Sequence, residues 1–532
     1  MCRPNERESV MKTLSVAAII GFAGLAAMTL PAGAETVLKV VPQADLKNID
    51  PNLNTATITQ LHGYMVYDVL VGADRTLDWK PQMAESWTVS PDGLTYIFKL
   101  RSGLKWHDGS TVTTRDIIPS IERWAAKSGD GKTLMKYVGR VAAKDDMSFE
   151  IVLKEKVGIV LSALGNPFLP AFMMREKDAK LSPDEPVKEA IGSGPFTFEA
   201  KEWEPGHKVV YKRNAAYTPR AEPSNAYAGA KAPKVDRVEW LYIPDSTIAV
   251  QSLLKGEVDI LEQPSTDLIP TMKKDPNVTL KILDPFGTIG MLRFNHLYPP
   301  FNDARIRRAA LHAIDQTALL DAMVGQPDLQ KPCLAVFMCG GPFESDVATA
   351  PFARPDIAAA KKLLAEAGYK GEPVVLMDPT DQNLVHNISV VAASQLKAAG
   401  FNVDLQSMDW STMTSRRGNK AQPGQGSPGW NIFPTFWTGF IIGNPGTNIP
   451  LAGDAVWPGW YTDAETEKLR GEFLTTTDRD QQKKIAEALQ RRYYEQVPYL
   501  STGQFRRPVA WRNTVSGVPE TLQLSVWNVE KK

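Results

Sequence analysis

Apolar residues alternate with polar ones in several short segments of the chain and recur at helical spacing in several longer segments. Alternation of period two predicts strands at residues 36–41, 94–100, 149–153, 235–243, 278–283, 288–294 and 401–405. Helical spacing predicts helices at residues 117–126, 247–255, 303–324, 358–367, 387–399, 462–475 and 478–496. Strands that alternate with helices indicate α/β lobes with mixed sheets.

Turn and cap residues divide these segments from one another. Pro91 and Gly93 occupy the second and fourth positions of a type I turn, which predicts a hairpin there. Asp303 stands where it would cap the helix predicted at 303–324. The stretch 177–188 is rich in proline and charge, and we expect a domain boundary in it.

The stretch 430–445 (WNIFPTFWTGFIIGNP) contains five aromatic side chains and no charged one. Aromatic residues followed by Gly and Pro predict a short buried strand that runs into a loop. We interpret this stretch as one wall of a ligand cleft between two lobes. The alternative is ordinary core, since aromatic runs are found in cores more often than in sites.

The N-terminus has the pattern of a targeting segment. Lys12 precedes the apolar run 14–30, and small residues up to Ala34 form a cleavage motif before Glu35, which predicts a signal peptide over residues 1–34 whose natural start is Met11. A membrane anchor is the alternative, but the run is short for a span and ends in a cleavage motif. No cysteine follows the cleavage point, which argues against a lipid anchor. We expect an exported, unanchored protein.

Two of the three cysteines, Cys333 and Cys339, remain after the leader is removed. In an exported protein, two cysteines this close predict a small disulfide loop. The alternative is a metal-binding pair, which would need further ligands, and no histidine lies nearby in the sequence. We therefore predict a disulfide, with no metal site and no cofactor.

A chain of 532 residues is too long to fold around one hydrophobic core, which indicates two or three domains. The formal net charge is +0, so the overall balance does not indicate nucleic-acid binding. Neither G-x-S-x-G nor H-E-x-x-H occurs. Residues 126–133 match a phosphate-binding loop only formally, because a predicted helix precedes them where that motif needs a strand; we expect a Gly-rich loop there. These observations favour a protein that is not an enzyme.

The adjacent residues Arg416 and Arg417 precede a loop rich in Gly, Pro and Gln. A guanidinium fork suits the capture of a ligand carboxylate or another anion. The alternative is a solvated pair on the surface.

Residues 81–109 read PQMAESWTVSPDGLTYIFKLRSGLKWHDG. This segment resembles the signature of the family 5 extracellular solute-binding proteins, which are peptide, nickel and opine receptors of bacterial ABC importers. Further similar segments follow in the family's order at residues 191–217, 256–260, 295–315, 363–369 and 395–410. The resemblance implies an α/β, two-lobed periplasmic binding protein fold (type II) with an additional domain inserted in the first lobe, closing on ligand by hinge motion.

The resemblance also implies a division of the chain. Lobe I would consist of residues 35–63, 190–284 and 505–532, the additional domain of residues 64–189, and lobe II of residues 285–504.

In peptide-binding members of the family, a segment like Trp437-Thr438-Gly439 runs past the ligand, and the next position is an Asp that pairs with the peptide's α-amino group. Phe440 takes that position here. A buried ammonium without a carboxylate partner is poorly compensated. Either the ligand lacks a free amino terminus, or another acid such as Asp454 takes over.

The remaining site residues follow in the same way. The family's basic position, which faces a ligand carboxylate, falls on Arg417. The early loop that touches ligand falls at Asn54, Thr55 and Thr57. We further expect Trp430 to pack against the ligand with Trp437 and Phe440.

The resemblance implies a periplasmic, monomeric substrate-binding component of an ABC importer. It would capture a peptide or a peptide-like, opine-like solute and deliver it to the membrane permease, and it would not bind nucleic acid. The alternatives are a receptor for oligosaccharides or metal chelates on the same fold, a peptide-binding chaperone, and a secreted hydrolase.

Overall fold

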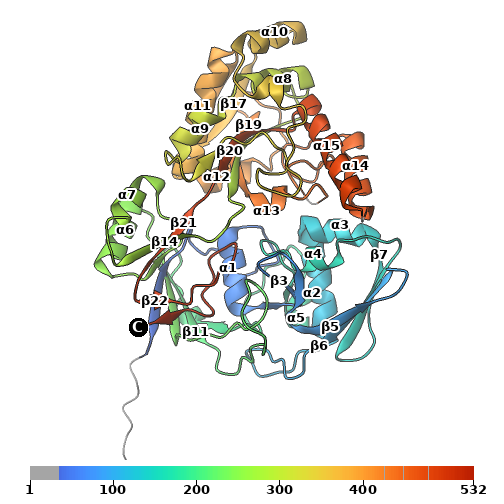
Figure 1. Ribbon diagram of the computed structural model, residues 1–532, viewed down its shortest axis with the longest axis vertical. Coiled ribbons are helices and arrows are strands. Elements are labelled where there is room, and N and C mark those ends of the chain that lie inside the picture. The colour runs from blue at the N-terminus through green and yellow to red at the C-terminus, as the bar shows by residue number, and fades with distance from the viewer. Residues whose placement is uncertain (1–34, 425, 447, 477) are drawn as a thin grey trace, which may run out of the picture. The chain divides into compact units, whose positions relative to one another are not determined.

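The computed structural model describes residues 35–424, 426–446, 448–476 and 478–532 (Figure 1). The predicted signal peptide, residues 1–34, lies outside the described residues. Thr36–Lys532 form one compact unit. No helix within the described ranges is long and apolar enough to cross a bilayer.

The first large sheet is mixed and has seven strands. In spatial order they are β10 (Phe196–Phe198), β11 (Lys208–Arg213), β12 (Arg237–Leu241), β1 (Val37–Val41), β13 (Ile260–Leu261), β21 (Pro508–Arg512) and β14 (Val278–Ile282). Strand β1 is parallel to β12 and β13, whereas β21 is antiparallel to β13 and β14. The carboxyl ends of β13 and β14 therefore lie at the same end of the sheet as the amino end of β21.

The second large sheet has six strands and lies in the upper part of Figure 1. In spatial order they are β16 (Gln330–Lys331), β20 (Tyr499–Phe505), β15 (Thr288–Phe294), β19 (Ile432–Thr438), β17 (Pro373–Pro379) and β18 (Asn402–Met408). The helices around it are α8 (Ala304–Ala313), α9 (Gln316–Met323), α10 (Ile357–Ala367), α11 (Asn383–Ala398), α12 (Trp410–Arg416), α13 (Gly439–Ile442), α14 (Ala464–Thr475) and α15 (Arg479–Gln496).

A third, antiparallel sheet has four strands in the order β5 (Ala84–Val89), β6 (Thr95–Leu100), β8 (Ser148–Leu153) and β7 (Val138–Ala143). The predicted hairpin joins β5 to β6. Four helices belong to this part of the chain, namely α2 (Thr114–Lys127), α3 (Gly129–Tyr137), α4 (Val160–Leu164) and α5 (Glu176–Ala179). Phe98, Trp124 and Phe149 are among the residues of its separate hydrophobic core.

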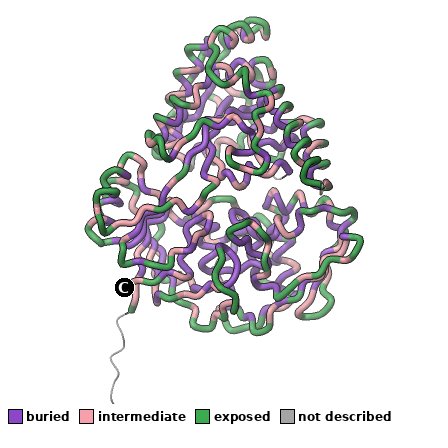
Figure 2. The backbone as a smooth tube through the Cα atoms, viewed as in Figure 1, coloured by how far each residue is buried: buried purple, intermediate pink, exposed green. Residues whose placement is uncertain are grey.

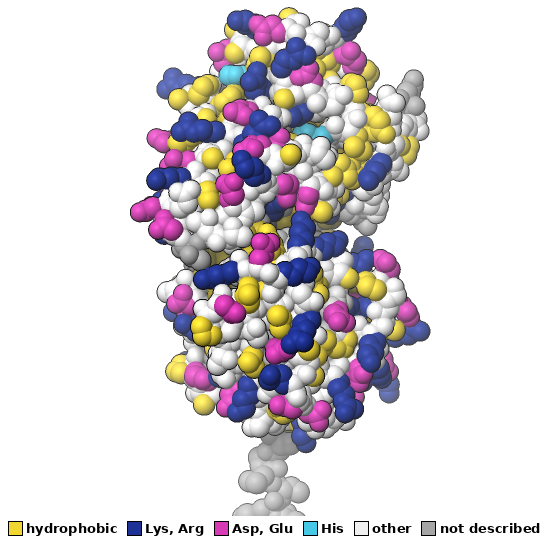
Figure 3. Space-filling view, turned by 90° about the vertical axis from the view of Figure 1, so that its right-hand side faces the viewer, with side chains coloured by type: hydrophobic (Ala, Val, Ile, Leu, Met, Phe, Trp, Pro, Cys, Tyr) yellow, Lys and Arg dark blue, Asp and Glu magenta, His cyan; other side chains and the backbone are white. Residues whose placement is uncertain are grey.

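The remaining elements are short. They are α1 (Thr57–Val66), α6 (Ser246–Lys255), α7 (Ile269–Met272) and the strand pairs β2 (Asp68–Val69) with β9 (Phe172–Met173), β3 (Val71–Ala73) with β4 (Trp79–Pro81), and β22 (Val515–Ser516) with β23 (Glu530–Lys531). Buried backbone runs through the large sheets and α1 (Figure 2). On the face shown in Figure 3, acidic and basic side chains are intermingled, in line with the balanced composition.

The chain passes from the seven-stranded to the six-stranded sheet through residues 283–287 and returns through residues 506–507. The first connection touches the end of β20 and the start of the second connection at Gly287, where a Cβ atom would lie 2.5 Å from the Phe505 carbonyl oxygen and 3.2 Å from Arg506 Cγ. The Gly287 carbonyl also accepts a hydrogen bond from the Gly439 N–H at 2.7 Å, which fixes the start of α13 against the first connection.

The alternating pattern of strands and helices predicted an α/β protein, and this prediction is confirmed. The prediction of a single helix at 303–324 is wrong, because this segment forms two helices, α8 and α9. Asp303 caps α8 as expected, whereas Ile314 is extended and Asp315 accepts hydrogen bonds from the N–H groups of Thr317 and Ala318. The second aspartate therefore begins a new helix.

Two loops predicted from glycine are helical instead. Residues 439–442 form α13, because the Thr438 side chain accepts a hydrogen bond from the Ile441 N–H and caps a short helix. The Gly-rich loop expected within 126–133 is the junction of α2 and α3, where the Ser128 side chain caps α3 by accepting from the Gly131 N–H.

Candidate functional site: a cavity between the two large sheets

A partly open cavity of about 90 Å³ lies between the ends of the two large sheets. It is lined by Gln43, Thr57, Phe168, Glu262, Gln263, Leu283, Asp284, Gly287, Thr288, Phe436, Thr438, Arg507, Val509, Leu522, Gln523 and Leu524. The lining combines apolar side chains with a few amide, hydroxyl and charged groups, which is the usual character of a small-molecule site.

Sheet topology brings three charged residues of this lining to one place. Glu262 directly follows β13, Asp284 lies two residues after β14, and Arg507 directly precedes β21. Because β21 runs antiparallel between β13 and β14, these three positions share one end of the sheet. Asp284 and Arg507 are also in the two connections between the sheets.

The hydrogen bonds of these residues are few. The Gln43 N–H donates to Glu262 Oε2 at 2.8 Å, and the Phe286 N–H donates to Asp284 Oδ1 at 2.9 Å. The Arg507 guanidinium donates from Nη1 to Gln263 Oε1 at 2.6 Å and lies 5.0 Å from the ring centroid of Phe436.

Burial dominates the electrostatics of this cluster. It raises the pKa of Glu262 to about 7, against the lowering effect of the Gln43 N–H and of Arg507. It likewise raises the pKa of Asp284 to about 7, although hydrogen bonds from the Phe286 and Gly287 amides and the charge of Arg507 lower it. Burial also lowers the pKa of Arg507. For both acids, the cost of burying the charged form therefore outweighs the stabilisation of that form by Arg507.

Three aromatic rings pack together beside the cavity, and one of them, Phe168, lines it. Phe168, after α4, and Phe440, in α13, have ring centroids 5.7 Å apart, and Phe286 lies 6.4 Å from Phe440. Leu169 and Ile441 belong to the same apolar contact. Residues from the part of the chain around the four-stranded sheet therefore touch the end of β19 and α13.

Part of the predicted site falls at this cavity. Thr57 and Thr438 line it. Trp437, Gly439 and Phe440 adjoin Thr438 on β19 and α13, and Trp437 packs with Phe440 in the apolar contact described above.

Other predicted site residues lie elsewhere. Trp430 has no exposed surface and packs with Phe433 in the core of the six-stranded part, instead of facing the cavity. Arg417 lies 5.7 Å over the Phe433 ring, and burial lowers its pKa. Arg416 donates to the carbonyl oxygens of Pro428 and Gly429, both at 2.8 Å, and so holds the loop before β19.

The early loop lies in a neighbouring pocket. Asn54 and Thr55 line a pocket of about 180 Å³ together with Trp124, Lys127 and other residues, and neither lines the cavity between the sheets. Asp454, the acid considered as a substitute for the Asp replaced by Phe440, forms an ion pair with Lys136 at 3.5 Å and does not line the cavity either.

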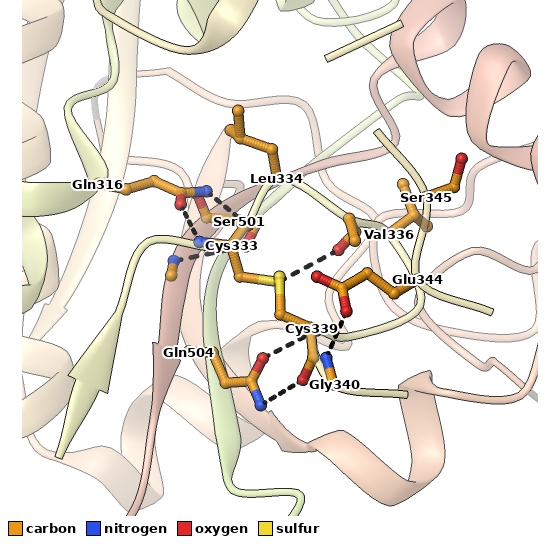
Figure 4. The surroundings of a disulfide bond; sticks show 12 residues. Gln316, Cys333, Leu334, Val336, Cys339, Gly340, Glu344, Ser345, Ser501 and Gln504 are labelled. Carbon is orange, nitrogen blue, oxygen red and sulfur yellow. Dashed lines mark hydrogen bonds between the residues drawn. A yellow bond between two sulfur atoms is a disulfide. The ribbon is translucent and has the colours of Figure 1, made fainter. Parts of the chain in front are cut away.

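Cys333 and Cys339 form a disulfide in a loop beside the site (Figure 4). The Gln504 side chain accepts from the Cys339 N–H at 2.9 Å and donates to the carbonyl oxygen of Phe286 at 2.9 Å. The loop is thereby tied to the connection that carries Asp284. Within the described ranges, no group of three or more His, Cys, Asp or Glu is arranged to hold a metal ion.

Glu262, Asp284 and Arg507 were not predicted as site residues. Each is a charged residue at or near the end of an apolar strand, which is a signal visible in the sequence. That signal becomes specific only when the pairing of β13, β21 and β14 is known.

Comparison with known proteins identifies the family. Residues 78–423 match the family model described as "Bacterial extracellular solute-binding proteins, family 5 Middle". The chain belongs to the family 5 solute-binding proteins. It is also 40% identical over 525 residues to a "Probable peptide ABC transporter periplasmic-binding protein y4tO" of Sinorhizobium fredii, covering 96% of this chain and 98% of that relative. The family resemblance seen in the sequence is confirmed.

More distant members of family 5 share the architecture. The oligopeptide-binding protein AppA of Bacillus subtilis is 26% identical over 495 residues, covering 88% of this chain and 86% of AppA. The structure of AgaA of A. tumefacien R10 in complex with agropinic acid matches with a TM-score of 0.79 at 21% identity, covering 93% of this chain and 99% of AgaA. AppA with a bound nonapeptide matches with a TM-score of 0.77 at 20% identity, covering 93% and 99%. The prediction of the two-lobed fold is confirmed.

Proposed function

We propose that this protein is the periplasmic substrate-binding component of an ABC importer and that it captures a peptide or a peptide-like, opine-like solute in the cavity between its two large sheets. The observation that carries the proposal is the cavity itself, which is lined by residues from the ends of both sheets and combines aromatic side chains with Glu262, Asp284 and Arg507. The names of the relatives support the solute class, since they include peptide-binding proteins and a protein that binds agropinic acid.

We further propose that residues 35–63, 190–284 and 505–532 act as one lobe, that 285–504 act as the other, and that 64–189 form the additional domain. The two connections at 283–287 and 506–507 support this division. In the proposed cycle, an exported monomer closes on its solute by bending at these connections and presents the closed form to the permease. Its role is binding and delivery, without catalysis.

Native mass spectrometry of the protein purified from its own periplasm tests the proposal. A solute enclosed between two lobes dissociates slowly, so we expect a bound mass that fragments as a short peptide or as an amino-acid conjugate. A sugar or a metal chelate as the bound mass would contradict the proposed solute class. Turnover of a peptide or ester panel that survives purification would contradict the binding role.

A further inference from the structure

We propose that the cavity binds a cationic group of the solute, an ammonium or a guanidinium, between Glu262 and Asp284. The inference rests on the proposed function, because it assigns a ligand group to the same cavity. It identifies the solute as one that carries a positive charge at the end that enters the cavity.

The first support is the state of the Glu262 carboxylate. Its residue is only 4% exposed, and it lines the cavity. Its Oε2 atom accepts from the Gln43 N–H, whereas no residue in the described part of the chain donates to its Oε1, which is not among the fully buried side-chain atoms. This oxygen is therefore free to accept from a donor group of a ligand in the cavity.

The second support is the charge count of the lining. Glu262 and Asp284 are its acids, and Arg507 is the sole cation among the described residues that line the cavity. Neither acid forms an ion pair with Arg507, whose guanidinium is directed to Gln263 and to the ring of Phe436. A bound cation favours the ionised form of both acids, and the two carboxylates then balance the charges of Arg507 and of the cation.

The third support is the surroundings of the two acids. The rings of Phe436 and Phe168 line the same cavity, and aromatic faces attract ammonium and guanidinium groups. The volume of about 90 Å³ suits a compact head group.

The experiment uses the purified exported protein, stripped of bound solute by unfolding and refolding. Three probe mixtures are compared by thermal shift and native mass spectrometry. They are di- and tripeptides with free amino termini, the same peptides with acetylated amino termini and no basic side chains, and the guanidino compounds arginine and agmatine. We expect the protein to bind a compound of the first or third mixture and to bind the acetylated peptides at least tenfold more weakly.

Glu262→Gln and Asp284→Asn should each weaken the bound cationic probe at least tenfold. Both substitutions keep the size of the side chain and an oxygen that accepts from the Gln43 or Phe286 amide. Glu85→Gln removes an acid whose side chain is 50% exposed on the four-stranded sheet and is the matched control. Circular dichroism identifies any variant that fails to fold. If one of the two variants does not fold, the affinity of the other variant tests the cation site.

The outcomes separate the two proposals. If acetylated peptides bind as tightly as free ones, or if both folded variants bind with wild-type affinity, the cation site is wrong and the peptide receptor stands. If none of the mixtures binds, the cation site is overturned together with the proposed peptide-like solute.

Discussion

Phe168, which lines the cavity, packs against Phe440 with ring centroids 5.7 Å apart and planes inclined at 36°. Phe168 follows α4, in the part of the chain that surrounds the four-stranded sheet, whereas Phe440 is in α13 beside the six-stranded sheet. The two parts of the chain are therefore in contact at this point. In the proposed cycle, opening of the lobes would separate the two rings and expose both to water.

Phe168→Ala should weaken the binding of the co-purified solute. Aromatic pairs of this kind contribute about 0.5–1.5 kcal/mol, so affinity should fall by roughly two- to tenfold as the closed form loses its ring contact. Calorimetry measures the affinity, and small-angle scattering measures how far the solute-free variant opens.

Phe343→Ala is the matched control for the ring contact. Phe343 and Phe473 form a pair with centroids 5.1 Å apart, and both belong to the part of the chain that includes the six-stranded sheet. This substitution should lower stability without changing solute affinity. Equal losses of affinity in both variants would show that the Phe168–Phe440 contact has no special role in closure.

Gly439→Ala should destabilise the protein and weaken solute binding. A Cβ atom at this position would lie 2.4 Å from the Phe286 carbonyl oxygen and 2.9 Å from Met338 Sδ, so α13 must shift away from the connection. Overpacking of this kind costs about 1–3 kcal/mol. Urea unfolding measures the stability, and calorimetry measures the binding.

The control for Gly439→Ala is Gly471→Ala. Gly471 is in α14, where no atom lies within 4 Å of the added Cβ. Alanine favours a helix interior over glycine by about 1 kcal/mol, so this variant should be more stable than the wild type. A Gly439→Ala protein of wild-type stability would mean that α13 tolerates the displacement.

The Cys333–Cys339 disulfide should contribute about 2 kcal/mol to stability, since it closes a short loop in the unfolded chain. Replacing both cysteines with serine should lower the free energy of unfolding by that amount but keep the fold. Gln316 and Gln504 still bind the loop backbone through the N–H groups of Cys333 and Cys339.

Urea unfolding with and without reductant tests the disulfide. Reductant should bring the wild type to the stability of the double-serine variant and leave that variant unchanged. If the wild type is equally stable under both conditions, the bond adds nothing to the free energy of unfolding.

Hydrophobic periodicity was sufficient to predict most of the fold, because burial of one face dictates where apolar residues recur. It failed at 303–324, where apolar spacing continues through Ile314 and into α9 although Asp315 starts a new helix. A cap inside a periodic segment is a local polar signal that the apolar pattern conceals. The start of α13 was missed for the same reason, because the capping residue Thr438 lies within a mainly apolar segment.

The candidate site was harder to predict than the fold. Residues 430–445 indicated one wall, and Thr438 lines the cavity. The charged groups come from Glu262, Asp284 and Arg507, which are distant in sequence and become neighbours only through strand pairing. Arg417 was more conspicuous in the sequence than Arg507, yet its guanidinium covers Phe433 in the structure.

Asp130 is a buried acid in the first turn of α3, 4% exposed. Burial raises its pKa to about 6, although a hydrogen bond from Asn166 at 2.6 Å and the charge of Arg470 in α14 lower it. Since the ordinary value is 3.8, the folded protein holds this proton more tightly than the unfolded chain does.

This difference predicts a pH-dependent stability. The contribution of protonated Asp130 is fully present below about pH 4 and is lost as the pH rises through about 6. Asp130→Asn should therefore stabilise the protein at pH 8, by at most about 3 kcal/mol, and the gain should vanish near pH 4. Urea unfolding at several pH values measures the difference.

The control is Asp146→Asn, because the Asp146 side chain is 71% exposed, and this variant should show no such trend. A constant difference between Asp130→Asn and the wild type across this range would mean that Asp130 ionises as it does in the unfolded chain.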